Sequence, residues 1–158
     1  MAIKFQKQNS DYGFMSNFYP CTVVYEGVTY KSSEAAFQAY KSGLPQDRLR
    51  FSLMKASESK YAGNRVKMRP DWETFKFEHM YNVCLAKFSQ NPNLRDLLIA
   101  TGDEELIENT YWHDQCWGIC SCELHNGKGK NNLGKILMRI RTELREEQEK
   151  KGEPIWEF

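Results

Sequence analysis

The feature that most constrains this chain is an apolar stripe near its C-terminal end. In residues 133–144, large aliphatic side chains recur at i, i+3, i+4, i+7 and i+11, namely Leu133, Ile136, Leu137, Ile140 and Leu144. This spacing places them on one face of an α-helix, so the rest of the fold must cover that face. Asn131 or Asn132 is suited to cap the helix. Residues 145–151 carry no such stripe, which predicts a solvated helical extension.

A second stripe predicts another long helix. After Trp72, apolar residues fall at i, i+3, i+7 and i+11, namely Phe77, Met80, Cys84 and Phe88. Two prolines predict further helix starts. Pro45 precedes Leu49, Leu53 and Met54 at core spacing, and Asn91–Pro92 begins a short helix that ends near Gly102. The chain is therefore mainly helical.

The strand signals are few. In residues 22–30, β-branched and aromatic residues flank Glu26–Gly27, which predicts a hairpin. Residues 106–111 predict a strand. Strands do not alternate regularly with helices, so we expect an α+β fold rather than a doubly wound sheet. No linker divides the chain, so we expect one compact domain over residues 1–145, followed by a charged C-terminal extension over residues 146–158.

Composition excludes several function classes. With 22 Lys and Arg against 21 Asp and Glu, the net charge of +1 provides no overall field for holding nucleic acid or an anionic membrane. No apolar run is long enough to span a bilayer, and the first residues lack the apolar core of a signal peptide, so we expect a cytoplasmic protein. The five cysteines are expected to be reduced thiols.

Three polar residues share one face of an otherwise apolar helix predicted over residues 35–41, which Ser32 and Ser33 are suited to cap. Glu34, Gln38 and Lys41 are spaced i, i+4 and i+7. Polar groups on a buried helix are costly unless they are partnered or line a pocket, which makes this trio a candidate site. A purely structural alternative is that Glu34 and Lys41 only complement the helix dipole.

Two further segments are candidates for binding. Asp114–Gly118 carries Trp117 next to a glycine, which suits stacking on a planar heterocycle, although Trp117 is equally suited to filling the core. Residues 127–134 combine glycines, two lysines and the start of a helix, which favours an anion such as phosphate. The segment lacks the Walker pattern, and a flexible basic turn is the alternative.

Five potential metal ligands fall within thirteen residues, namely His113, Cys116, Cys120, Cys122 and His125. Their spacing is irregular, and Cys120 and Cys122 would point apart in an extended strand. We therefore expect free thiols and no metal. A small zinc-binding interaction protein is kept as an alternative.

Seven short segments, in order, resemble the NADAR family over roughly residues 5–145. They are YGFMSNF at 12–18, SEAAFQAYK at 33–41, RPDW at 69–72, AKF at 86–88, LIE at 106–108, DxxWG at 114–118 and GKNxLGxxLMxxR at 129–141. After Trp117–Gly118 the family usually has a further glycine and a shorter loop, whereas this chain has ICSCELH at 119–125. Because the family motif needs no cysteine there, the resemblance also counts against zinc.

The resemblance implies an N-glycosidase that cleaves a ribosyl N-glycosidic bond in a phosphorylated substrate and needs no cofactor. The substrate would be a riboflavin biosynthesis intermediate, or ADP-ribose attached to a base such as guanine, including in nucleic acid. A non-catalytic ADP-ribose or NAD-binding module is the alternative. Together with the basic turn, which adds Lys130, the resemblance gives a set of site residues. The catalytic residues are Glu34, Lys41 and Asp114, and the binding residues are Asn17, Gln38, Trp117, Gly118, Lys130 and Asn131.

The expected roles follow the chemistry of the bond. Cleavage builds positive charge on C1′ and the ring oxygen, which a carboxylate such as Glu34 would stabilise while orienting water. Asp114 and Trp117 are suited to the leaving base. Lys41 has two open roles: it would either hold a phosphate or, if desolvated, attack the opened sugar as a Schiff-base nucleophile.

Overall fold

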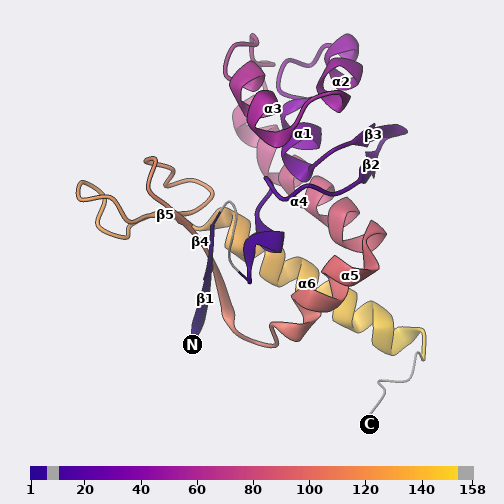
Figure 1. Ribbon diagram of the computed structural model, residues 1–158, viewed down its shortest axis with the longest axis vertical. Helices are drawn as coiled ribbons and strands as arrows, with labels where there is room; N and C mark the ends of the chain where they lie inside the picture. The colour runs from indigo at the N-terminus through magenta and orange to yellow at the C-terminus, as the bar shows by residue number, and fades with distance from the viewer. Residues whose placement is uncertain (7–10, 153–158) are drawn as a thin grey trace.

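The computed structural model describes residues 1–6 and 11–152 (Figure 1). In chain order the elements are β1 (Ala2–Phe5), the 3-10 helix η1 (Gly13–Met15), β2 (Val23–Tyr25), β3 (Val28–Tyr30), α1 (Ser33–Gln38), α2 (Pro45–Ser52), α3 (Ala56–Gly63), α4 (Trp72–Gln90), α5 (Pro92–Ala100), β4 (Glu105–Thr110), β5 (Ile119–Cys120) and α6 (Asn132–Lys150). The expected α+β class, mainly helical with few short strands, is confirmed. No helix in the described ranges combines the length and apolar character needed to cross a membrane.

The two long helices organise the core. The apolar stripe of α6 packs against α4 and β4, and its members Leu133, Leu137, Ile140 and Leu144 are buried as predicted. Helix α6 continues without a break from the apolar stripe to Lys150, so the first part of the expected extension is the end of this helix (Figure 1). The remainder of that extension, residues 153–158, lies outside the described residues.

The strands form two small sheets. In one, β4 lies between β1 and β5 and runs parallel to both. In the other, β2 and β3 form the predicted antiparallel hairpin, which turns at Glu26 and Gly27 with φ values of 48° and 81°. The sequence did not predict β1 or β5. With four and two residues they are too short for a periodic pattern to identify them, and both pair with β4.

Some positions predicted for the core are exposed. Leu49 and Leu53 of the α2 region are 64% and 76% exposed, and Phe77 of α4 is 41% exposed. Helical spacing marks one face of a helix, but it does not say how far the neighbouring elements extend to cover that face. Phe77 is partly covered by the ring of Trp117, which lies far away in the sequence.

Helix α1 holds the site from within the core. All of its residues, Ser33–Gln38, are buried, and it packs against α2, α3 and α4. The helix was predicted to continue to Lys41, but it ends at Gln38. The Lys41 backbone N–H donates to the carbonyl of Gln38 at 3.1 Å, which tightens the last turn and leads the chain out of the helix. Lys41 therefore lies just beyond the C-terminus of α1.

Candidate active site

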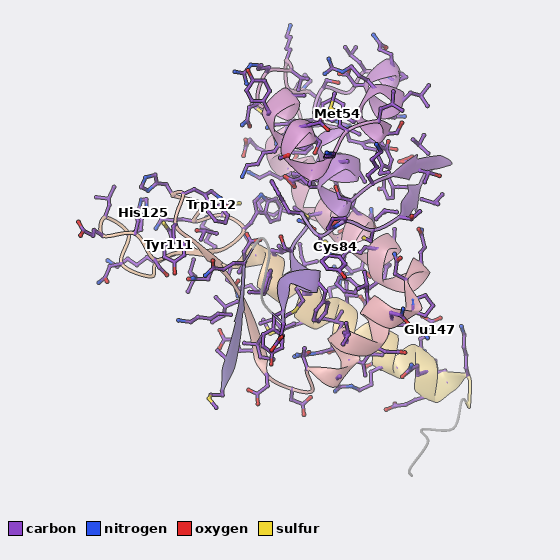
Figure 2. All side chains as sticks on the ribbon, in the orientation of Figure 1. Met54, Cys84, Tyr111, Trp112, His125 and Glu147 are labelled. Carbon is purple, nitrogen blue, oxygen red and sulfur yellow. The ribbon has the colours of Figure 1, made fainter. Side chains whose placement is uncertain are left out.

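One cleft of about 180 Å³ brings together α1, α3, α4, β4 and the long loop between β4 and α6. In Figure 1 that loop projects from the body beside β5, and Figure 2 labels Trp112 in this loop, two residues after the end of β4. The cleft is lined by Ser16, Asn17, Phe18, Glu34, Phe37, Gln38, Lys41, Lys60, Trp72, Lys76, Met80, Glu108, Trp112, Asp114, Trp117 and Leu133.

Glu34 is a carboxylate held in a mostly apolar wall. Ser32 caps α1, since its hydroxyl accepts a hydrogen bond from the Ala35 backbone N–H at 3.1 Å. Glu34 follows in the first turn and is only 7% exposed. The Gln38 side-chain N–H donates to Glu34 Oε1 at 3.2 Å, one helical turn away. The carboxylate is therefore oriented before any ligand enters the cleft.

Gln38 fits because residue 63 has no side chain. A Cβ added at Gly63 would collide with the amide oxygen of Gln38. That oxygen is buried and has no hydrogen-bond partner among the described residues. A buried unsatisfied acceptor is costly, and such costs in native proteins are concentrated at functional sites. The observation supports a role for Gln38 in setting the position of Glu34.

Asn17 ties the chain before the hairpin to the start of α1. Its backbone carbonyl accepts from the Glu34 N–H at 3.1 Å, and its Oδ1 accepts from the Ser33 hydroxyl at 2.8 Å. Lys87 is fully buried and donates to the carbonyls of Phe14 and Ser16 at 2.7 and 2.9 Å, which fixes the preceding turn. Asn17 therefore lines the cleft and also positions the residue that carries the carboxylate.

Three lysines border the cleft, namely Lys41, Lys60 and Lys76. Burial lowers the pKa of Lys41 from its ordinary value, while the carboxylates of Glu34 and Glu73 oppose this shift and the two other ammonium groups add to it. A larger fraction of Lys41 is therefore neutral at a given pH than for an exposed lysine. Among the sequence-predicted residues, Lys41 is the one whose chemistry this environment changes most clearly.

The other two lysines have different surroundings. Lys76 forms an ion pair with Glu73 at 2.7 Å. Lys60 Nζ lies 5.4 Å from the ring centroid of Trp112 and 5.7 Å from that of Phe18. Positive charge on an aromatic face is attracted by the ring, so these rings help to hold the Lys60 ammonium at the mouth of the cleft.

The loop after β4 forms the facing wall. Asp114 Oδ1 accepts from the backbone N–H groups of Cys116 and Trp117 at 3.0 and 2.9 Å, which closes a tight turn. The Trp117 ring packs edge-on against Phe37 at a centroid distance of 5.6 Å. It also lies 5.5 Å from the ring of Phe77. The indole is thus fixed in the cleft that Glu34 also lines, and the Asp114 carboxylate holds its backbone.

The structure brings six of the nine predicted site residues to the cleft, namely Asn17, Glu34, Gln38, Lys41, Asp114 and Trp117. Gly118, Lys130 and Asn131 lie outside its lining. Gly118 is needed for packing, since an added Cβ would lie 2.6 Å from the Glu108 carbonyl oxygen and 2.8 Å from Thr110 Cγ2. It lets the loop lie directly against β4.

Asn131 and Lys130 also make structural contacts, the first through its side chain and the second through its backbone. The Asn131 side chain donates to the Leu106 carbonyl at 2.9 Å and accepts from the Glu108 N–H at 3.1 Å, so it ties the start of α6 to β4. It has a left-handed φ of 52° and makes no side-chain cap to α6. Lys130 is exposed, and its backbone N–H donates to the Gln115 carbonyl at 2.8 Å. Asn131 therefore positions Glu108, which lines the cleft.

Four residues that line the cleft were not predicted as site residues from the sequence, namely Lys60, Lys76, Glu108 and Trp112. Glu108 was quoted only as part of a family segment. The lysines lie on helices whose exposed faces carry many charges, and no local spacing separates a cleft lysine from a solvated one. A further group, His113, Cys120, Cys122 and His125, gathers in the loop after β4, and none of its members lines the cleft.

Comparisons with known proteins are consistent with this geometry. Residues 4–145 match the model of the NADAR domain. The chain is 36% identical to N-glycosidase YbiA of Escherichia coli strain K12 over 147 residues, which is 90% of this chain and 88% of that protein. It is 34% identical to N-glycosidase Npun_R5314 of Nostoc punctiforme over 151 residues, covering 92% of this chain and 94% of the relative.

A longer relative and a solved structure are also similar to this chain. The chain is 36% identical to riboflavin biosynthesis protein VVA0006 of Vibrio vulnificus over 149 residues, or 91% of this chain, but it spans only 39% of that protein. The NMR structure of E. coli YbiA matches with a TM-score of 0.77 and 31% identity, covering 94% of this chain and 89% of the other.

Proposed function

This chain belongs to the NADAR family, and from that premise we propose that it is an N-glycosidase that hydrolyses a ribosyl N-glycosidic bond in a phosphorylated substrate. The relatives named N-glycosidase share more than a third of its residues over nearly the whole chain. The activity is therefore that of a hydrolase acting on N-glycosyl bonds. The phosphorylated ribosyl substrate is the finer part of the proposal and rests on the cleft.

The observation that carries the proposal is the buried Glu34 carboxylate, held by Gln38 at the floor of a cleft. When the bond between C1′ and nitrogen breaks, its electron pair moves to the nitrogen and positive charge develops on C1′ and the ring oxygen. A fixed carboxylate beside that carbon stabilises the charge. Water then adds its oxygen to C1′, and one of its protons passes to Glu34, which returns that proton to the leaving nitrogen, so that the carboxylate is regenerated.

The facing wall suits the leaving base. Trp112 and Trp117 present flat rings to the cleft, and planar heterocycles bind to such rings by stacking. Asp114 lines the same wall, and its Oδ1 is engaged by two backbone N–H groups. We assign Asp114 the task of positioning Trp117.

The lysines suit the phosphate. Lys41 and Lys60 border the cleft together with Lys76, and their charge offsets that of the carboxylates Glu34 and Glu108. An ammonium group binds phosphate as a point charge. Lys41 also meets the requirement of an amine nucleophile, because burial lowers its pKa. In that role the ring oxygen leaves C1′ as a hydroxyl, which makes C1′ the carbon of a protonated imine with the substrate nitrogen. The neutral Lys41 amine would add to this carbon and expel the substrate amine, which leaves C1′ bound to Lys41 as an imine, and water would then hydrolyse that imine to release the sugar.

The experiment is a product assay on three substrate groups: a phosphoribosylamino intermediate of riboflavin biosynthesis, a free ADP-ribosyl nucleotide, and ADP-ribosylated guanine in nucleic acid. We expect release of a ribose phosphate or ADP-ribose, together with the free amine or base, from one group. Chromatography and mass spectrometry would identify both products. If calorimetry shows binding of ADP-ribose or NAD and no group is cleaved, the chain is the binding module kept as the alternative.

The two roles of Lys41 are separable with the cleaved substrate. If Lys41 only holds phosphate, Lys41→Arg keeps part of the activity, since the charge remains. If it forms an imine, Lys41→Arg is inactive, and borohydride added during turnover leaves a covalent sugar adduct on Lys41 in the unmodified enzyme. Because the amine must be neutral to attack, kcat/KM then rises with pH through the lowered pKa of Lys41. The burial of Lys41 favours the imine role. An active Lys41→Arg enzyme with no trapped adduct would contradict it.

A further inference from the structure

Four metal-binding side chains converge in the loop between β4 and α6, away from the cleft lining. They are His113, Cys120, Cys122 and His125, and one ligand atom from each lies within 4.8 Å of all the others. Two of the three histidines of the chain and two of its five cysteines are in this cluster. Figure 2 shows His125 in the projecting loops beside β5, on the same side of the molecule as Trp112. The cluster therefore belongs to the wall that carries the two tryptophans.

The distances within the cluster match those around a tetrahedral zinc ion. Zn–N bonds of about 2.0–2.1 Å and Zn–S bonds of about 2.3 Å place two nitrogen ligands about 3.3 Å apart and a nitrogen and a sulfur about 3.6 Å apart. The Nδ1 atoms of His113 and His125 are 3.3 Å apart. Cys122 Sγ lies 3.4 Å from the first and 3.2 Å from the second. Three edges of a tetrahedron are thus present.

The chain reaches this arrangement because β5 ends at Cys120. The backbone of Cys120 pairs with Lys128 and with Gly127, at 2.9 and 2.7 Å, so the segment between them folds back as a compact turn. Asn126 and Gly127 have left-handed φ values of 48° and 77°. Cys120 and Cys122 are therefore not two positions of one extended strand, and the sequence-based reason for expecting no metal does not apply to this turn.

A hydrogen bond places the second sulfur. The His125 backbone N–H donates to Cys122 Sγ at 3.4 Å, which holds the sulfur beside the imidazole of the same turn. His113 comes from the other side of the loop, directly after β4, and has a left-handed φ of 67°. Histidine is one of the residues that adopts this conformation more often than most, and the His113 ring nitrogen lies 3.4 Å from Cys122 Sγ. The ligands are drawn from two separate segments, as in structural zinc sites.

We propose that His113, Cys120, Cys122 and His125 bind one zinc ion that braces the substrate-facing loop. Two thiolates and two neutral imidazoles balance the charge of Zn²⁺. Four protein ligands fill a tetrahedral shell and leave no position for water, so this is a structural site. Nitrogen and sulfur ligands also disfavour Mg²⁺ and Ca²⁺, which prefer oxygen.

The loop has little apolar burial to support it, so it depends on hydrogen bonds and on any bound ion. Within residues 111–130, only Gly118 and Cys120 are buried, and Leu124 is 80% exposed. His113 lies between Trp112 and Asp114, which both line the cleft. Fixing His113 by a metal bond therefore restricts its two neighbours. The proposed ion acts on the active site through the position of the loop, at a distance from the reacting atoms.

The test begins with untagged protein, because a histidine tag would bind zinc itself. We expect elemental analysis to find about one zinc per chain after gel filtration. Co²⁺ added to chelator-treated protein is expected to give the visible and near-ultraviolet absorption bands of tetrahedral thiolate coordination. Cys122→Ser and His125→Ala should each weaken zinc binding by about tenfold or more, because removing a direct ligand costs more than disturbing an outer-shell partner. Cys116→Ser, in the same loop but outside the cluster, is the matched control and should bind as the unmodified protein does.

Two results of these zinc and Co²⁺ measurements would overturn the proposal. A zinc-free protein whose Co²⁺ spectrum shows no thiolate band would overturn the proposal, as would a Cys116→Ser loss equal to that of Cys122→Ser. If a cluster variant does not fold, the Co²⁺ spectrum of the unmodified chain still decides the question. No substrate enters these measurements, so their result is independent of the proposed glycosidase activity.

Discussion

The two walls of the cleft are held by different forces. The helical wall, α1 with Glu34 and Gln38, is buried along its whole length and packs on three other helices. Behind it, His79 stacks on Phe37 and Phe75 at centroid distances of 5.4 and 5.0 Å. Its position is set by apolar burial and close packing, and such a scaffold resists small displacements.

The loop wall, residues 111–131 with Trp112, Asp114 and Trp117, has few buried side chains. It is held by backbone hydrogen bonds, by the Asp114 turn, by the Asn131 link to β4 and, as proposed above, by zinc. The carboxylate that we propose acts in bond cleavage therefore lies on the wall held by apolar burial, whereas the rings that we propose bind the leaving base lie on the wall held mainly by hydrogen bonds.

The largest expected effect is on the helical wall. Glu34→Gln keeps the size of the side chain and its link to Gln38 but removes the charge next to the reacting carbon. We expect kcat to fall by about 10²-fold or more, with ligand affinity and melting temperature nearly unchanged. Steady-state kinetics, ligand titration and thermal unfolding would measure the three quantities.

The matched control for this variant is Glu149→Gln, which removes one carboxylate from an exposed position of α6. It should turn over substrate at the normal rate. Near-normal turnover by Glu34→Gln would show that the carboxylate has no role in the mechanism. It would also contradict the proposal that the helical wall carries the group that acts in bond cleavage.

A smaller effect is expected on the loop wall. Asp114→Ala removes the acceptor of two backbone N–H groups and frees the turn that carries Trp117. We expect KM to rise by about tenfold, the equivalent of about one hydrogen bond to a charged group, with a smaller change in kcat. Asp114→Asn retains an acceptor oxygen and should recover most of the loss. If Asp114 is instead a general acid, Asn fails as completely as Ala and kcat falls by about 10²-fold in both.

The same contrast explains what could be predicted from the sequence. The α6 stripe and the spacing of Glu34 and Gln38 on α1 are periodic, so local spacing indicated both the helix and the carboxylate of the helical wall. The sequence of the loop wall has no periodic pattern of apolar and polar residues. Asn131 links to β4, and Gly118 packs against the β4 backbone, because β4 pairs with the two-residue strand β5. No local sequence pattern indicates that pairing.

Lys60 and the metal cluster illustrate the same limit. Lys60 lies on an ordinary charged helix and reaches the cleft only because α3 packs against α1. His113 and His125 are twelve residues apart, and only the turn after β5 brings their rings together. The physical reason is that the place of Lys60 at the cleft and the contact between the two histidine rings both depend on tertiary packing. The local sequence of each segment would also allow other placements in the fold.

The smallest expected effect is an acid sensitivity of the helical wall. Burial lowers the pKa of His79 from 6.5 to about 4, although its ring N–H donates to the Phe37 carbonyl at 3.0 Å, and Arg69 and Arg48 lower it further. The folded protein thus takes up less proton than the unfolded chain between these two values, so the free energy of unfolding decreases as the pH falls from 6.5 toward 4. Between pH 6.5 and 5.5 the loss is about 1 kcal/mol, which lowers the melting temperature by about 2–4 °C.

Calorimetry at the two pH values measures this shift. A chelator is added so that the loop wall contributes no metal-linked protons. In His79→Phe, which keeps the aromatic stacking but does not titrate, the shift should be reduced; an equal shift in that variant would place the acid sensitivity elsewhere.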